Sequence, residues 1–281
     1  MARGPRRDEE LWLDGDEEAP RPTASARKPL EGRAKTLAPE SANGTVAQLF
    51  PNRGGVRLDS RPGIVLCNYR LATLAVRGER RERSPVCVGD RVRVEGDVIV
   101  GRCERRNALA RLAPNARNPV VHVIAANVDV LVVVAAAREP DFTPGFVSRL
   151  LAAAAEQGVA GVVCANKADL LEPGAARPWT DFASAAAAVV ECSARSGAGV
   201  AELDRLVRGK AAAFCGNSGV GKTSLLRRLL GDDSYGRVAE LSAATGKGRH
   251  TTTGAILLPG PGSSTWIDTP GIMDFEGASS R

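Results

Sequence analysis

A short glycine-rich segment between two apolar runs constrains the fold of this chain more than any other feature. Residues 216–223 read Gly-Asn-Ser-Gly-Val-Gly-Lys-Thr; they follow the apolar run Ala211–Cys215 and lead into an expected helix over Lys222–Leu230. This G-x-x-x-x-G-K-[ST] spacing is typical of a loop whose backbone N–H groups bind nucleotide phosphates. Lys222 would neutralise the β- and γ-phosphates, and the Thr223 hydroxyl would bind Mg²⁺. The alternative is a glycine-rich turn that binds no nucleotide.

Two other polar segments follow apolar runs and are suited to select the base of that nucleotide. Residues 166–169 (Asn-Lys-Ala-Asp) come directly after the run 161–165, and residues 193–195 (Ser-Ala-Arg) follow the run 188–192. The Asp169 carboxylate could accept hydrogen bonds from N1–H and the 2-amino group of guanine, donors that adenine does not offer. The serine and alanine of the second segment would support guanine from its other edge. The sequence therefore predicts that GTP and GDP bind in preference to ATP.

Two further motifs would contact the γ-phosphate and Mg²⁺. Residues 268–271 (Asp-Thr-Pro-Gly) follow the run 265–267 and fit D-x-x-G, in which the aspartate reaches Mg²⁺ through water and the glycine contacts the γ-phosphate. Residues 248–253 (Gly-Arg-His-Thr-Thr-Thr) form a switch-like loop with a candidate threonine ligand for Mg²⁺. We assign Thr252 to this role and keep Thr251 and Thr253 as alternatives.

These motifs define the candidate binding residues. The expected Mg²⁺ ligands are Thr223, Thr252 and Asp268. The expected nucleotide-binding residues are Asn166, Lys167, Ala168, Asp169, Ser193, Ala194, Gly216, Asn217, Ser218, Gly219, Val220, Gly221, Lys222, Thr223, Ser224 and Gly271.

The order of the motifs along the chain is unusual. In most GTPases the phosphate-binding loop comes first, but here the base-selecting segments at 166 and 193 precede it. The sequence therefore predicts a circularly permuted GTPase domain. A permutation preserves the sheet, because termini that lie close together can be joined.

The second part of the chain has the pattern of a doubly wound α/β domain with a P-loop, over residues 114–281. Near-continuous apolar runs separated by helix-length segments are typical of parallel strands that are buried on both faces. Cys164, Cys192 and Cys215 lie in these runs, and we interpret them as buried structural residues. The expected strands are 128–137, 161–165, 188–192, 211–215, 255–258 and 265–267, and the expected helices are 146–157, 200–208 and 222–230.

The first part of the chain divides into a tail and a small barrel. Residues 1–42 combine an acidic run with scattered prolines and lack sustained periodicity, which predicts a disordered tail. Residues 43–113 show short strands between glycine turns and predict an all-β OB-fold barrel that binds RNA; an SH3-like barrel without that role is the alternative. The expected strands are 44–49, 56–58, 64–68, 71–76, 86–94 and 98–105, with a bend at Gly89-Asp90.

The net positive charge of the chain is concentrated in the predicted barrel. Residues 43–113 contain 14 arginines, no lysine and 7 acidic residues, out of a net charge of +6 for the whole chain. Arginine donates hydrogen bonds in pairs to phosphate and stacks on bases, so this excess favours a polyanionic partner. The alternative is a solvated surface that serves solubility.

Composition excludes several classes of protein. No apolar run approaches the roughly 20 residues of a membrane span, and none follows the Arg6-Arg7 pair as a signal sequence would require. The six cysteines include no C-x-x-C pair, and the two histidines lie away from them, so no zinc site is expected in this chain. We expect a monomeric cytoplasmic protein without a membrane partner.

The combination of motifs resembles the family of ribosome small-subunit-dependent GTPase A, over about residues 43–276. The resemblance rests on V-G-D-R-V at Val88–Val92, R-R-N-x-L-x-R at Arg105–Arg111, A-N-V-D at Ala126–Asp129, and the permuted G-N-S-G-V-G-K-T-S and G-R-H-T-T-T motifs. It implies a GTP-hydrolysing factor that binds the immature small ribosomal subunit and its rRNA late in assembly, near the decoding region. It also implies slow hydrolysis that the subunit stimulates, with Mg²⁺ as the cofactor of GTP.

The sequence departs from the family pattern in two places. The family continues after D-x-x-G with a helix and a small zinc domain that has clustered Cys and His ligands, whereas this sequence shows no such cluster and ends at Arg281, soon after Gly271. The other departure is Cys67–Arg70, where the family more often has a basic pair in the barrel.

The position after the D-x-x-G motif bears on the mechanism. Ile272 stands where Ras-like enzymes carry the glutamine that orients water, so we expect slow intrinsic turnover. The orienting group would come from the partner or from the switch-like loop. His250 is the internal candidate, because it is the imidazole near the nucleotide and the resemblance places a functional histidine there; together with Lys222 it forms the candidate catalytic set. The alternative for His250 is a loop residue that contacts rRNA or solvent.

Two other classes of function remain open at this point. One is a GTP-regulated RNA-binding scaffold with little hydrolysis. The other is a metabolic or signalling GTPase whose barrel binds a protein.

Overall fold

The computed structural model describes residues 36–69, 82, 84–112, 121–236 and 254–269. The chain divides into two compact units, residues 1–31 and 32–281, and all described residues belong to the second. Several predictions fall outside the described residues: most of the tail, the strand over 71–76, and the site residues His250, Thr252, Gly271 and Ile272.

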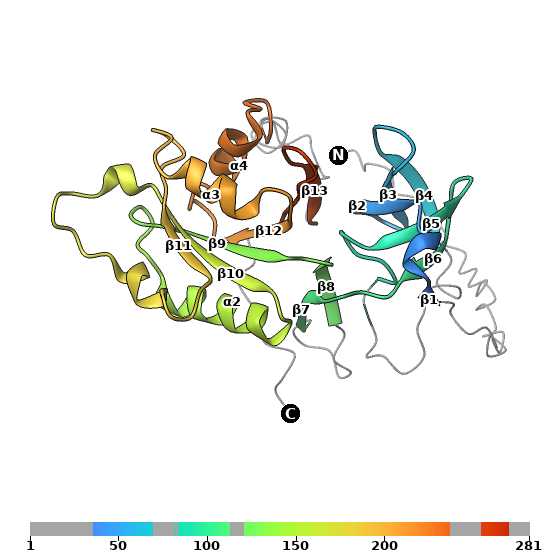
Figure 1. The fold of residues 1–281 in the computed structure, drawn as a ribbon, viewed down its shortest axis with the longest axis horizontal. Helices are drawn as coiled ribbons and strands as arrows, with labels where there is room; N and C mark the ends of the chain where they lie inside the picture. The colour runs from blue at the N-terminus through green and yellow to red at the C-terminus, as the bar shows by residue number, and fades with distance from the viewer. Residues whose placement is uncertain (1–35, 70–81, 83, 113–120, 237–253, 270–281) are drawn as a thin grey trace, which may run out of the picture. The chain divides into compact units, whose positions relative to one another are not determined.

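Strands near the N-terminus form a closed barrel (Figure 1). Strand β2 pairs with β3, β3 with β4, and β4 with β6 in parallel; β5 then pairs with both β6 and β2 and closes the ring. This order fits the predicted OB-fold. The strands are β2 (Gly44–Phe50), β3 (Arg53–Leu58), β4 (Val65–Tyr69), β5 (Arg91–Glu95) and β6 (Val98–Cys103).

The interior of the barrel is filled by alternate residues of these strands. Val46, Val56, Cys67, Val92 and Ile99 are fully buried and form one cluster. Because successive side chains of a strand point to opposite faces, the residues between them face outward. Each buried valine contributes roughly 1.5–3 kcal/mol to stability relative to an exposed one.

Two boundaries predicted for the barrel are wrong. Thr36–Leu37 forms strand β1, which pairs with β6, and Pro39–Ser41 forms a 3-10 helix, so the ordered part begins before residue 43. Leu37 packs directly on Gly101, where a Cβ would lie 2.7 Å from the leucine Cδ1. A strand this short leaves no periodic pattern in the sequence.

The strand expected over 86–94 begins only at Arg91. Gly89 has a φ of +90°, and a Cβ at this position would lie 2.2 Å from the Ala126 carbonyl oxygen. Glycine is therefore required where the chain turns against the next element. The bend predicted at this point is real, and it precedes the strand instead of interrupting it.

A separate hairpin crosses the predicted domain boundary at residue 113. Strand β7 (Ala108–Leu112) pairs antiparallel with β8 (Val121–Ala126), and neither strand was expected from the sequence. Residues 113 and 114 lie between the two strands, so this boundary divides a paired element.

The second part of the chain forms a largely parallel sheet. Its order is β13-β14-β12-β9-β10-β11, and β13 alone among these strands runs antiparallel to its neighbour. Ile256 of β13 also pairs with Gln48 of β2, which joins this sheet to the barrel. The strands are β9 (Val130–Ala136), β10 (Ala160–Asn166), β11 (Ala188–Glu191), β12 (Ala211–Gly216), β13 (Ile256–Pro259) and β14 (Thr265–Asp268).

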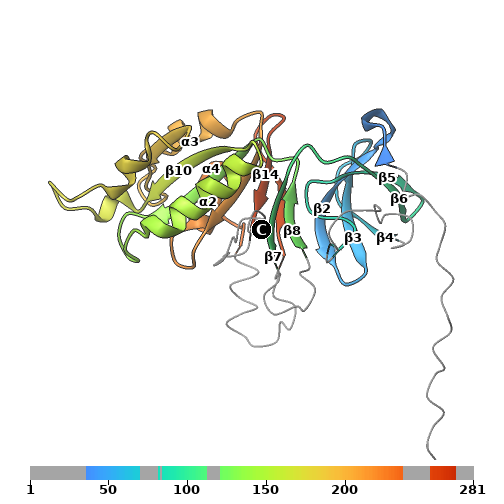
Figure 2. The same ribbon diagram turned by 90° about the horizontal axis from the view of Figure 1, so that it is seen from below.

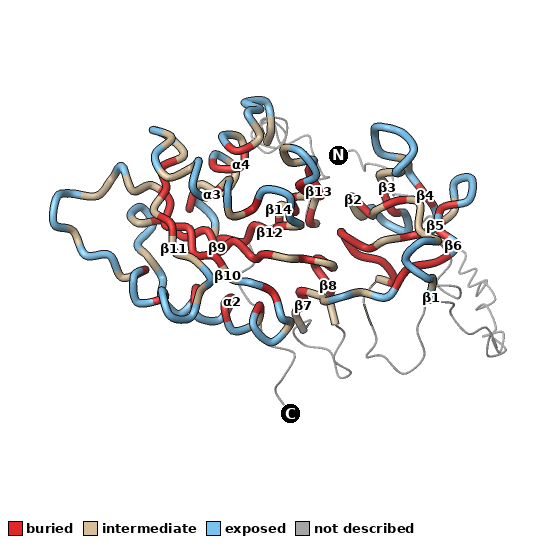
Figure 3. Tube along the Cα trace, in the orientation of Figure 1, coloured by how far each residue is buried: buried red, intermediate tan, exposed pale blue. Residues whose placement is uncertain are grey.

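Helices cover both faces of this sheet (Figures 1 and 2). Helix α2 (Pro144–Glu156) packs with Leu131 and Val133 of β9, whereas α3 (Val200–Val207) and α4 (Lys222–Leu230) pack with Val130 and Val132 on the other face. Every residue of β9 is buried, as Figure 3 shows, which explains its continuous apolar run. The predicted helices are confirmed to within two residues at each end.

No helix in the described part of the chain is long and apolar enough to cross a membrane.

The strands β9, β10, β11, β12 and β14 run in the same direction, so their carboxyl ends meet at one edge of the sheet. Ligands of open α/β sheets bind at that edge. All of the described site residues lie there or in the loops that follow these strands.

Candidate nucleotide-binding site

The glycine-rich segment forms a turn between β12 and α4, as the sequence predicts. Strand β12 ends at Gly216 and helix α4 begins at Lys222. Gly219 and Gly221 have φ values of +79° and +87°, a conformation that other residues rarely adopt. A Cβ at Gly216 would lie 2.5 Å from the Val134 carbonyl oxygen. The turn therefore leaves the N-terminus of α4 facing the carboxyl edge of the sheet, where an anion is stabilised.

Asn166 connects the segments that the sequence assigns to the base and to the phosphates. Its Nδ2 donates a hydrogen bond to the Val220 carbonyl oxygen at 2.9 Å, and its Oδ1 accepts one from the Ala194 amide at 3.0 Å. The side chain is 1% exposed, so these bonds satisfy a buried amide. One residue thus holds the loops after β10, β11 and β12 in register.

The expected guanine-selecting carboxylate is oriented by a neighbouring loop. The Ser193 hydroxyl donates to Asp169 Oδ1 at 2.6 Å, and the Ser196 amide donates to the Ser193 hydroxyl at 3.0 Å. Each carboxylate oxygen can accept more than one hydrogen bond, so the carboxylate can accept from a base as well. The serine and aspartate predicted from separate motifs therefore form one unit.

Lys167 and Ala168 complete the loop after β10. Lys167 has a φ of +63°, and its ammonium group donates to the Glu139 carbonyl oxygen in the loop after β9. The Ala168 amide donates to the Cys192 carbonyl oxygen at 3.0 Å. The loop after β9 also approaches the glycine-rich turn, because a Cβ at Gly219 would lie 3.8 Å from Pro140 Cδ. The sequence gave no indication that this loop borders the site.

Asp268 lies beside the start of α4, and its carboxylate has two donors. The Lys222 ammonium group contacts Oδ1, and the Tyr235 hydroxyl donates to Oδ2. Burial and the neighbouring Asp268 charge raise the pKa of Tyr235 above its ordinary value, so the hydroxyl keeps its proton and acts as the donor. Tyr235 was not predicted, because an isolated tyrosine between motifs carries no recognisable pattern.

The residues expected to bind Mg²⁺ supply suitable donors. Thr223 is the second residue of α4, and Asp268 ends the adjoining strand β14. Their hydroxyl and carboxylate oxygens are the hard donors that Mg²⁺ prefers. Within the described ranges there is no cluster of three or more His, Cys, Asp and Glu side chains. Mg²⁺ commonly binds through one or two side chains together with phosphate oxygens, so this donor set fits the ion.

Thr269, the second residue of D-x-x-G, is a structural anchor that sequence reasoning also missed. Its hydroxyl donates to the Phe214 carbonyl oxygen at 2.9 Å and lies 3.1 Å from Cys215 Sγ. Burial raises the pKa of Cys215 to about 11, and the thiol stays neutral. Cys164, Cys192 and Cys215 are fully buried, which confirms their structural interpretation. The remaining residues His250, Thr252 and Gly271 lie outside the described residues, and their roles stay predictions.

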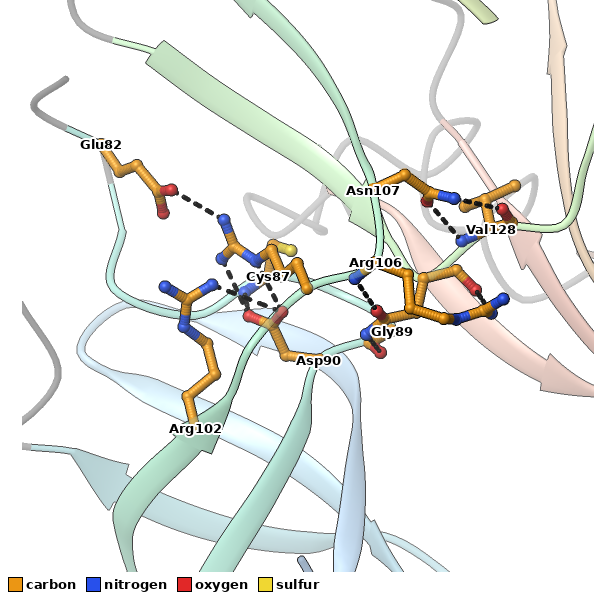
Figure 4. A network of polar contacts seen from close by, with 10 residues as sticks. Glu82, Cys87, Gly89, Asp90, Arg102, Arg106, Asn107 and Val128 are labelled. Carbon is orange, nitrogen blue, oxygen red and sulfur yellow. Dashed lines mark hydrogen bonds and ion pairs between the residues drawn. The ribbon is translucent and has the colours of Figure 1, made fainter. Parts of the chain in front are cut away.

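The arginines of the R-R-N motif have intramolecular partners (Figure 4). Arg105 binds both oxygens of Asp90, at 2.7 and 2.9 Å, and also Glu82 at 2.7 Å. Asp90 is fully buried, and the Arg105 side chain is 8% exposed. Arg106 pairs with Asp129 at 2.8 Å. These arginines hold the fold together, so the number of arginines in the barrel overstates the charge presented to a polyanion.

The A-N-V-D motif is connected by hydrogen bonds to the barrel, to the hairpin region and to the second sheet. Asn127 donates to the Gly89 carbonyl oxygen at 2.9 Å and accepts from the Arg106 amide at 2.9 Å. Asn107 binds both backbone groups of Val128 at 2.8 Å. Asp129 accepts from the Ala211 amide at 2.8 Å, at the start of the strand that leads into the glycine-rich turn.

A different part of the barrel carries exposed arginine and apolar side chains together. Arg53 and Arg61 are exposed, and Phe50 and Ile64 are 39% and 48% exposed. Phe50 and Ile64 lie close together, because a Cβ added at Gly55 would be 3.3 Å from Phe50 Cε2 and 2.9 Å from Ile64 Cγ2.

Comparison with known proteins agrees with this arrangement. The model of the RsgA GTPase family matches residues 102–278. The small ribosomal subunit biogenesis GTPase RsgA of Chlorobaculum tepidum is 37% identical over 78% of this chain and 71% of its own length; that of Azotobacter vinelandii is 40% identical over 73% and 61%. The protein of the same name from Chlorobaculum parvum is 38% identical over 68% of this chain and 65% of its own length. The chain thus spans about two thirds of the length of these relatives.

Solved structures show the same fold. The crystal structure of YjeQ from Thermotoga maritima has a TM-score of 0.59 and 26% identity, covering 82% of this chain and 74% of that one. The structure of YloQ, described as a circularly permuted GTPase, has a TM-score of 0.50 and 22% identity, covering 83% of this chain and 72% of that one. The likeness to these two structures supports the fold of this chain.

Proposed function

Because this chain belongs to the RsgA GTPase family, we propose that it binds and hydrolyses GTP in the late maturation of the small ribosomal subunit. The observation that carries this proposal is the convergence of separate motifs at one edge of the sheet. The glycine-rich turn, the Asn166–Asp169 segment, the Ser193 loop and Asp268 all lie at the carboxyl ends of parallel strands or directly after them. The names of the relatives support the ribosomal role.

The proposed mechanism separates recognition of the base from that of the phosphates. Asp169, oriented by Ser193, accepts hydrogen bonds from guanine. Backbone N–H groups of the turn and Lys222 bind the β- and γ-phosphates. When the phosphates bind, the Lys222 ammonium group leaves the Asp268 carboxylate that it contacts in this structure. Thr223 and Asp268, with Thr252 from the switch-like loop, would hold Mg²⁺, which neutralises charge on the phosphate oxygens. Gly271 would contact the γ-phosphate.

We assign the orientation of the attacking water to His250 or to the ribosomal partner. Ile272 provides no hydrogen bond to water, which supports slow intrinsic turnover. The motif that senses the γ-phosphate comes last among the motifs because of the permutation. Whatever follows it in the chain would respond to the state of the nucleotide.

The proposed partner of the barrel is small-subunit rRNA. Exposed arginines beside an exposed phenylalanine support this assignment, since guanidinium groups bind phosphate and aromatic rings stack on bases. We further propose that the protein is a monomer and acts in the cytoplasm, where the named function of its relatives would be carried out.

The test is a measurement of GTP hydrolysis with and without purified small ribosomal subunits. Stimulation by the subunit supports the proposal. Binding to the subunit without stimulation would favour a GTP-regulated RNA-binding scaffold, and absence of binding would favour a GTPase whose barrel has a protein partner.

A further inference from the structure

The two oxygens of the Asp268 carboxylate are contacted by donors from different parts of the chain. Lys222 at the start of α4 contacts Oδ1, and Tyr235, which follows the end of that helix, donates to Oδ2. The Asp268 and Lys222 side chains are 17% and 12% exposed, so water competes little for these bonds. The carboxylate is therefore held in one orientation.

The residue after Tyr235 contacts the other expected Mg²⁺ ligand within the described part of the chain. Gly236 has a φ of +79°, and a Cβ there would lie 2.6 Å from Thr223 Cγ2. The Tyr235 carbonyl oxygen accepts a hydrogen bond from Arg227 on α4. A turn at Asp232 precedes this pair, with the Ser234 amide donating to Asp232 Oδ1 at 2.9 Å. The dipeptide Tyr235-Gly236 is thus tied to α4 and lies against both Thr223 and Asp268.

A hydroxyl donor on Asp268 Oδ2 takes one of the positions at which a water ligand of Mg²⁺ would donate. Mg²⁺ usually keeps several water ligands, and these donate to nearby carboxylates. Phosphate oxygens attract Lys222, so the bond to Oδ1 is exchanged when nucleotide binds. The bond from Tyr235 fixes the carboxylate in its nucleotide-free orientation, and it competes with a water ligand of Mg²⁺ for Oδ2.

We propose that Tyr235 is a positioning residue that holds Asp268 in the nucleotide-free protein and releases it when Mg²⁺ and guanine nucleotide bind together. This inference rests on the proposed function, because it takes Asp268 as part of the Mg²⁺ site. Release of the hydroxyl would free the turn at 232–236 from strand β14, so occupancy of the metal site is transmitted to the chain after α4.

The first test measures how Mg²⁺ slows the dissociation of a fluorescent GDP analogue from the full chain. Y235F removes the competing donor and keeps the ring, so the Mg²⁺ concentration for half-maximal retention should fall about three- to ten-fold. The matched control is Y69F, which alters the other tyrosine of the chain, in the barrel, and should leave that concentration unchanged. An unchanged or higher concentration for Y235F overturns the proposal. Absence of any GDP binding by the unaltered chain would instead overturn the proposed function.

A second measurement keeps the hydroxyl group of residue 235. The chain has two tyrosines, so labelling with 3-fluorotyrosine in a Y69F background leaves one ¹⁹F signal. This signal should differ between the protein with GDP and EDTA and the protein with GDP and Mg²⁺, because only the second state releases the hydroxyl from Asp268. The same signal in both states overturns the proposal.

Discussion

The side-chain amide of Asn166 donates to the Val220 carbonyl oxygen at 2.9 Å and thereby joins the base-selecting loop to the phosphate-binding turn. The same side chain accepts from the Ala194 amide at 3.0 Å. The loop expected to recognise guanine and the turn expected to bind phosphate are therefore linked through one buried residue. A change at this residue should affect both.

Asn166→Ala should weaken both GTP binding and folding. It leaves the Val220 carbonyl and the Ala194 amide without their partner, and each unsatisfied buried group costs about 1–3 kcal/mol. Calorimetric titration with GDP and thermal unfolding without nucleotide measure the two effects. Asn68→Ala is the control: it removes an exposed amide in the barrel, away from this site, and should change neither quantity by as much. Equal GDP affinity for the alanine variant and the unaltered chain would contradict this link.

Nucleotide selectivity should depend on Asp169. GTP and GDP should compete for the site and ATP should not, because adenine lacks the donors that the carboxylate accepts. Asp169→Asn should shift preference toward xanthine nucleotides, since an amide donates where the carboxylate accepted. Competition against a fluorescent GDP analogue measures both. Ser193→Ala removes the hydroxyl that orients Asp169 and should reduce affinity without changing the preferred base. Equal competition by ATP and GTP would refute the assignment.

The arginines of the barrel should separate into structural and RNA-binding groups. Arg105→Ala leaves Asp90 buried without its main partner, which costs about 3–5 kcal/mol and should lower the melting temperature by roughly 10 °C or more. Arg53→Ala removes an exposed charge and should leave the melting temperature nearly unchanged.

Arg53→Ala should weaken the binding of small-subunit rRNA more than Arg105→Ala does, the reverse of their effects on the melting temperature. The affinity should fall steeply as salt rises, and Arg53→Ala should reduce the salt dependence by about one released counterion. Filter binding over a range of salt concentrations measures this slope. An affinity that does not change between low and high salt would argue against an electrostatic interface.

Features that leave a pattern in the sequence were predictable, whereas features that depend on contacts between distant residues were not. Strands such as β9 are buried on both faces and appear as continuous apolar runs, so the sheet and its permuted order were predictable. Strand β1 and the hairpin β7–β8 are short or partly exposed and leave no such pattern. The motifs identified Asn166 and Asp268, but their partners Val220 and Tyr235 are distant in sequence and only the fold brings them together. Arg105 looked like a surface charge because its burial depends on Asp90.

The last prediction contrasts Lys222 with His250. Lys222→Ala should reduce GTP affinity itself, because it removes the positive charge at the start of α4 that would bind the phosphates. It also removes one of the two contacts of the Asp268 carboxylate and leaves the bond from Tyr235, so the unfolding temperature of the variant should be measured alongside. Equilibrium binding of a fluorescent GTP analogue gives the affinity.

His250→Ala should instead lower turnover stimulated by the small subunit by roughly ten-fold or more, the range expected for loss of a positioned catalytic side chain, and leave GTP affinity nearly unchanged. The reason is that Ile272 offers no group to orient water, so the task falls to the switch-like loop or to the ribosome. The assay compares single-turnover rates with and without subunits. Normal stimulation of the alanine variant would mean that the ribosome provides the orienting group.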